Sequence, residues 1–174
     1  MGKEGGRSGE ILDSPREVIS AASSFNLFLT MGPFVDIQEV ILKIGEGIAP
    51  EDSVDALADR LDAEKLLKLR LDVSLFYLHR SEETSSPQLA SEYLFKSVTE
   101  ALKGLAQYLG FKGSRSEIVS LLTEALGDWV DESWEVAMVL HYDGYIDNNL
   151  DESDVAHYSI RVKEFLAKCY EVLT

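Results

Sequence analysis

Residues 86–110 read SPQLASEYLFKSVTEALKGLAQYLG and carry the clearest helical pattern in the chain. Ser86 is a typical cap, Pro87 suits the first turn, and Gly110 ends the helix. Because several side chains on its apolar face are small, a neighbouring helix can approach this face closely. The face is formed by residues that recur at every third or fourth position: Ala90, Leu94, Ser97, Val98, Ala101, Leu105 and Leu109.

Helical periodicity and capping residues recur on both sides of this segment. After it, a capping box at residues 114–117 opens a helix over 114–126. Asp128 is expected to cap a helix over 128–145, and Asp151 to cap the last helix. Before it, residues 52–80 are expected to form one long helix, bent near Asp62.

The predicted fold class is all-α, because no segment favours a strand. Capping signals at Ser14 and Asp36 predict a two-helix N-terminal extension over residues 11–48, preceded by a disordered tail over residues 1–10. Short connections favour an antiparallel up-and-down helical bundle of about five core helices over residues 49–174. A helical solenoid is the weaker alternative, since no repeat of fixed period occurs.

Length, cysteine count and net charge limit the classes of protein to which this chain can belong. The 174 residues suffice for one domain of ordinary size, and the single cysteine, Cys169, cannot form an internal disulfide, which favours a reducing, cytoplasmic setting. No apolar run approaches the roughly 20 residues of a membrane-spanning helix. The net charge of −15 repels phosphate backbones and makes nucleic acid an unlikely partner.

Residues 128–154 hold nine carboxylates and no lysine or arginine. A calcium-binding EF-hand needs glycine in the middle of its loop and glutamate at its end. Loops starting at Asp143 or Asp147 place Asn148 or Glu152 where glycine belongs, so both registers fail. We therefore interpret the stretch as solvated helix surface plus the acidic first turn of the last helix, where the helix dipole favours negative charge.

Other catalytic and metal-binding motifs have little support. Cys169 falls on the apolar face of the last helix, where a thiol behaves as a small hydrophobic group. His79 and His157 are expected at the surface and His141 on the apolar side, and no second histidine or cysteine stands at zinc-ligand spacing. The glycines punctuate helices and form no phosphate-binding loop. We predict no catalytic residue, no metal site and no cofactor.

Two segments carry a resemblance to a known family. SEYLFKSVTEALKGLAQYLG (91–110) and WEVAMVLHYDGYIDNNLDESDVAHYSIRVKEFL (134–166) resemble the PaREP family of archaeal proteins, grouped with HEPN-type helical bundles. The similar features are a helix rich in small residues, a leucine-histidine-x-x-x-tyrosine segment, an acidic turn and a closing helix. The resemblance covers residues 50–174.

The resemblance implies an antiparallel bundle, often dimeric, in a superfamily that includes nucleotide-associated proteins, toxin–antitoxin components and ribonucleases. The ribonucleases carry an arginine followed after four to six residues by a histidine. The matching positions before His79, His141 and His157 hold no arginine. RNA cleavage by that chemistry is therefore not expected.

We expect a non-catalytic protein that acts by association, as a homo-oligomer or with a protein partner. A small ligand could lie between helices, with Lys96 neutralising an anion and Tyr93, His141 and Tyr145 supplying hydrogen bonds. Two alternatives stay open: a metal-dependent nucleotide- or RNA-processing enzyme of the HEPN type using Asp143 and Asp147, and an oligomerisation role for residues 11–48.

Overall fold

The structure is a computed structural model that describes residue 43 and residues 45–174. The predicted tail of residues 1–10 and nearly all of the predicted extension of residues 11–48 lie outside the described residues. No strand occurs in the part of the chain that is described, and the predicted all-α bundle is confirmed. The elements are α3 (Pro50–Asp55), the 3₁₀ helix η1 (Ala58–Arg60), α4 (Ala63–Glu83), α5 (Pro87–Leu109), α6 (Arg115–Leu126), α7 (Trp129–Val139), the π-helix η2 (Leu140–Ile146) and α8 (Glu152–Glu171).

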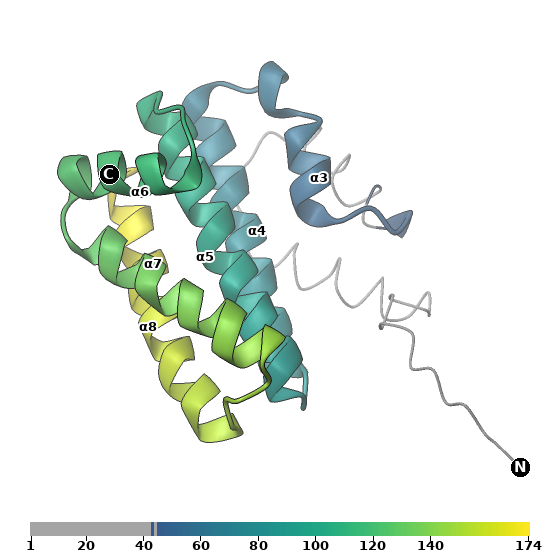
Figure 1. The fold of residues 1–174 in the computed structure, drawn as a ribbon. Helices are drawn as coiled ribbons and strands as arrows, with labels where there is room; N and C mark the ends of the chain where they lie inside the picture. The colour runs from purple at the N-terminus through teal and green to yellow at the C-terminus, as the bar shows by residue number, and fades with distance from the viewer. Residues whose placement is uncertain (1–42, 44) are drawn as a thin grey trace, which may run out of the picture.

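The helices α4 and α5 lie side by side at the centre of the fold (Figure 1). A three-residue turn, residues 84–86, joins them into a helical hairpin. The helices α7 and α8 pack on one side of this hairpin, whereas α3 packs on α4 on the other side. The short helix α6 crosses one end of the bundle near the C-terminus (Figure 1).

The contact between α4 and α5 is close because small residues line it, as the sequence predicts. Ser97 donates a hydrogen bond of 2.8 Å to the backbone oxygen of Ser74, and both serines are fully buried. At Gly104 an added β-carbon would lie 2.8 Å from Cβ of Arg70 and 3.1 Å from Leu67. Gly104 therefore sets how near the two helices can come.

Apolar side chains form two separate clusters. The larger one lies between α4, α5, α6, α7 and α8 and contains most of the predicted face of α5 together with Phe165 and Leu166. Cys169 belongs to it with no exposed surface, and burial raises the pKa of its thiol. The second cluster lies between α3 and the opposite side of α4, where Val54 and Leu57 contact Leu69 and its neighbours.

The predicted single helix over residues 52–80 is wrong. The helix α3 ends at Asp55, η1 follows, and α4 begins after Asp62, whose side chain accepts a hydrogen bond of 2.9 Å from the backbone nitrogen of Lys65. An aspartate that caps a helix takes a non-helical backbone conformation, so it interrupts the helix where the sequence predicted only a bend. Leu57 consequently turns into the second cluster.

Within the described residues, the other caps follow the sequence with one exception. Ser114 with Glu117, and Asp151 with Asp154, form reciprocal capping boxes. Asp128 stands at the predicted position before α7, but its side chain makes no capping hydrogen bond. None of the described helices is both long and apolar enough to cross a bilayer.

Replacing Gly104 with alanine tests the central contact. The added methyl group would press on the buried stem of Arg70, and overpacking of this kind costs about 1–3 kcal/mol. We expect the Gly104→Ala variant to lose that much unfolding free energy in urea titration, despite the higher helix propensity of alanine. A variant as stable as the wild type would show that α4 and α5 separate here at no cost.

Candidate functional site

The π-helix η2 is the least regular element of the bundle. The backbone nitrogen of Asp147 donates to the backbone oxygen of Tyr142 over 2.9 Å, which is the wider hydrogen-bond spacing of a π-helix. Gly144 rests so closely on Ser91 that a β-carbon would collide with the serine side chain. Gln88 fixes the segment further by donating to the backbone oxygen of Tyr145 over 2.7 Å. Such segments often occur at functional sites.

His141 lies on η2 against a carboxylate of α5. Its Nδ1 is 2.9 Å from Oε2 of Glu92, and the His141 and Glu92 side chains are 26% and 18% exposed. An ionised Glu92 accepts this hydrogen bond from Nδ1, which leaves Nε2 as the second polar atom of the ring. The predicted position of His141 on the apolar side is therefore correct, and the ring is half-buried.

Aromatic rings continue on both sides of His141. Phe95 stacks on it with ring centroids 4.3 Å apart, and Tyr145 lies nearly parallel to it with centroids 6.1 Å apart. Phe95 also contacts Trp134 at 6.5 Å. We call Trp134, Phe95, His141 and Tyr145 the aromatic row. Two large side chains of η2, Tyr142 and Ile146, are each 54% exposed at that end of the row.

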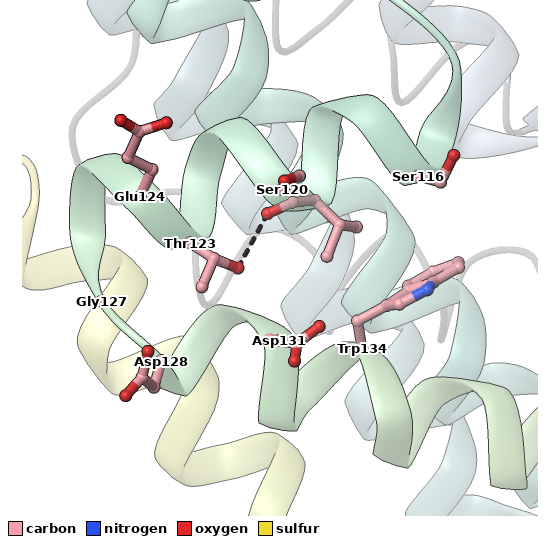
Figure 2. Close-up of a pocket in the computed structure, with 9 residues that line it drawn as sticks. Ser116, Ser120, Thr123, Glu124, Gly127, Asp128, Asp131 and Trp134 are labelled. Carbon is pink, nitrogen blue, oxygen red and sulfur yellow. Dashed lines mark hydrogen bonds between the residues drawn. The ribbon is translucent and has the colours of Figure 1, made fainter.

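A groove of about 710 Å³ between α6 and α7 adjoins the other end of the row. Figure 2 shows Asp131 and Trp134 projecting from α7 toward α6, with the hydroxyl groups of α6 opposite them. The dashed line marks the hydrogen bond of 2.8 Å from Thr123 to the backbone oxygen of Val119. The groove is lined by Ser116, Val119, Ser120, Thr123, Glu124, Gly127, Asp128, Asp131 and Trp134.

The charge around the groove and the row is negative. The groove lining contains three carboxylates and no basic residue, and all nine carboxylates of residues 128–154 are exposed. One cation is nearby, because the guanidinium of Arg115 lies 5.6 Å from the centroid of the Trp134 ring. No group of three or more potential metal ligands occurs in the described part of the chain. The predicted solvated, acidic surface agrees with this arrangement.

The four predicted ligand residues fall into two pairs on different sides of α5. His141 and Tyr145 meet at the aromatic row. Tyr93 and Lys96 lie with α3 and α4, where Tyr93 stacks on Tyr77 at 6.1 Å and the ammonium of Lys96 lies 5.3 Å from the Tyr77 ring. Each residue turns a helix by about 100°, so neighbouring positions on α5 face different helices.

Lys96 belongs to a second polar site, which we call the cationic cluster: Arg70, Lys96 and Lys103. Arg70 is fully buried and donates to three side chains, Oδ1 of Asp55 at 2.6 Å, Oε2 of Glu100 at 3.0 Å and Oε1 of Gln107 at 3.0 Å. Lys103 also donates to Oδ1 of Asp55 at 2.6 Å.

The pKa values of the two carboxylates that contact Arg70 shift in opposite directions. Partial burial works to raise the pKa of Asp55, but hydrogen bonds from Lys103 and Arg70 together hold it below its ordinary value. Glu100 is more deeply buried, and desolvation raises its pKa even though Arg70 is adjacent. Asp55 is thus the anion that binds the two cations most directly.

Sequence reasoning missed Arg70 because a charged residue in a long helix is ordinarily expected at the surface. The signal was the run LLKLRLDVSLFYL at 66–78, in which apolar residues surround Arg70 on every side of the helix. Such a pattern is typical of a helix buried on two faces. Both clusters of apolar side chains do contact α4.

Asp72 is a further carboxyl group, half-buried, that the sequence analysis did not single out. It lies between α4 and α8, where the hydroxyl of Tyr170 is 3.5 Å from its Oδ1. Burial raises the pKa of Asp72 to about 7, although the Tyr170 hydrogen bond opposes this shift. Its charge therefore changes near neutral pH, inside the bundle.

The fold and its sites define an acidic helical-bundle protein with a half-exposed aromatic row. A comparison with protein families matches residues 69–166 to the archaeal PaREP1/PaREP8 family, and the chain belongs to that family. The match confirms the resemblance seen in the sequence over a shorter range than residues 50–174, and it includes α5, α6, α7 and η2 entirely. Comparisons with curated proteins and with solved structures find no match.

The raised pKa of Asp72 predicts a pH-dependent stability. Its unfolded pKa is about 4, so the folded state binds this proton more tightly, and the stabilisation falls as pH rises from about 4 to about 7. The loss is at most about 4 kcal/mol. We expect Asp72→Asn, which cannot ionise, to match the wild type at pH 4 and to exceed it at pH 8 in urea titration. Parallel pH profiles would contradict this assignment.

Proposed function

We propose that this protein is a non-catalytic association module that binds a basic protein segment along the aromatic row and the α6–α7 groove. The observation that carries the proposal is the combination of half-exposed aromatic rings with exposed carboxylates on α6, α7 and η2. The row has Trp134 at one end, in the groove, and Tyr145 at the other, on η2. A partner can therefore contact both features at once.

Aromatic rings and carboxylates together favour a cationic partner. Guanidinium and ammonium groups bind over aromatic faces and pair with carboxylates, and these contacts strengthen as water is excluded. Arg115 over Trp134 is an example of this chemistry within the chain itself. A partner whose apolar side chains cover Tyr142 and Ile146 and whose basic side chains meet Asp131 and Asp143 complements the surface.

A second copy of the chain is a poorer occupant of the same surface. A two-fold interface brings one patch against itself, and the groove in this patch is lined by three carboxylates and no basic residue. Like charges placed opposite each other across an interface cost several kcal/mol. Association as a homo-oligomer, which the sequence analysis also raised, would have to use another face.

The single cysteine suits a cytoplasmic setting for the module.

The proposal predicts binding of a basic amphipathic helix. A 20-residue peptide of leucine and lysine should bind the full-length protein with a Kd on the order of 10 µM in calorimetry and weaken as salt is added. A peptide with glutamate in place of lysine should not bind. We expect Ile146→Ala to weaken binding about tenfold, since the residue lies beside the aromatic row.

Ile160 provides the matched control for this experiment. It is the same residue type, is 56% exposed against 54% for Ile146, and lies on α8. The Ile160→Ala variant should bind the basic peptide as the wild type does. Equal losses in both variants, or equal binding of the acidic peptide, would overturn the proposal.

The alternative function is a metal-dependent enzyme of the HEPN type that acts on nucleotides or RNA through Asp143 and Asp147. Both carboxylates are exposed, and no third ligand is grouped with them among the described residues. We expect 1 mM Mn²⁺ or Mg²⁺ to leave the Tm unchanged, because a ligand stabilises a protein only when it binds the folded state. A saturable rise in Tm that Asp143→Asn abolishes would favour the enzyme instead.

A further inference from the structure

The helix α3 covers the cationic cluster with its own carboxylates. Asp55 brings one oxygen, Oδ1, within 2.6 Å of both Nη2 of Arg70 and Nζ of Lys103. One turn earlier, Glu51 lies 3.6 Å from Nζ of Lys96 and also accepts a hydrogen bond from the hydroxyl of Tyr77. Two anionic groups from one side of α3 thus meet three cations of α4 and α5.

These contacts are the ones that phosphate groups make in proteins. A phosphate oxygen commonly accepts hydrogen bonds from a guanidinium and an ammonium group together, as Oδ1 of Asp55 does here. A second anionic group a short distance away suits a ligand with more than one phosphate. We propose that the cationic cluster is an oligophosphate-binding site that α3 closes with Glu51 and Asp55.

Removing α3 would leave an excess of positive charge. Arg70, Lys96 and Lys103 would then face one remaining carboxylate, Glu100. Arg70 would keep its ion pair with Glu100, whereas Lys96 and Lys103 would lose the carboxylates that pair with them. An anionic ligand replaces the charge that α3 supplies, and a neutral ligand does not.

The helix α3 is short enough to be displaced. It has six residues and no side-chain capping hydrogen bond at its start, whereas isolated helices below about 12 residues are marginal in water. Its other attachment is apolar, through buried Val54 and Leu57. An anion can bind only the molecules in which α3 is open. The apparent affinity is therefore the intrinsic affinity multiplied by the fraction of open molecules.

The test compares the binding of inorganic pyrophosphate by full-length variants. In Glu51→Gln/Asp55→Asn the carboxylates no longer compete, so we expect pyrophosphate to bind at least tenfold more tightly than to the wild type in calorimetry. Adding Lys103→Ala to this variant should remove the gain, because the ligand then loses one cation. Asp52→Asn, at an exposed carboxylate of α3, is the matched control and should behave as the wild type.

A folded double variant that binds pyrophosphate no more tightly than the wild type would overturn the proposal, as would a gain that survives Lys103→Ala. Should the double variant fail to fold by circular dichroism, Asp55→Asn alone decides the matter. Pyrophosphate should then raise its Tm by about 3 °C more than that of the wild type, at equal ionic strength set with sodium chloride. Equal rises would count against the site.

Discussion

A buried guanidinium in the middle of a helical hairpin constrains the whole structure. Arg70 cannot reach water, so the protein has to surround it with acceptors, and these come from α3 and from α5. The close approach at Gly104 brings α5 near enough to supply Glu100 and Gln107, which lie about two turns apart on the same helix. The position of α3 is coupled to the same residue through Asp55.

The helix α5 separates two kinds of surface. On one side, Glu92 and Phe95 hold His141 and the π-helix in place, with the acidic residues of α7 and η2 around them. On the other side, Lys96, Glu100 and Lys103 face α3 and α4. A protein with a net charge of −15 thus gathers three basic side chains in one site, where carboxylates pair with them and only Arg70 is fully buried.

Much of the fold follows from local signals in the sequence. Three features rest on periodicity or on capping signals: the face of α5 from Ala90 to Leu105, the caps at Ser114 and Asp151, and the burial of Cys169. The break at Asp62 was placed correctly but read as a bend, because periodicity alone does not distinguish a curved helix from a new one.

The sites were harder to predict because they depend on which helices become neighbours. The pairing of His141 with Glu92 joins residues 49 positions apart, and no spacing in the sequence announces it. The π-helix has the composition of an ordinary helix end and depends on the contact of Gly144 with Ser91. Tyr93 and Lys96 were expected to share a ligand with His141, but on α5 they face another side, where Tyr93 stacks on Tyr77 of α4 and Lys96 pairs with Glu51 of α3.

The burial of Cys169 makes its thiol unreactive in the folded protein. Its sulfur has no exposed surface and burial disfavours the thiolate, which is the form that reacts with alkylating reagents and oxidants. Modification therefore has to wait until α8 detaches from the larger cluster. The rate at which a maleimide reacts with Cys169 in native buffer therefore measures how often the C-terminal helix opens. No mutation is needed, because the chain has a single cysteine.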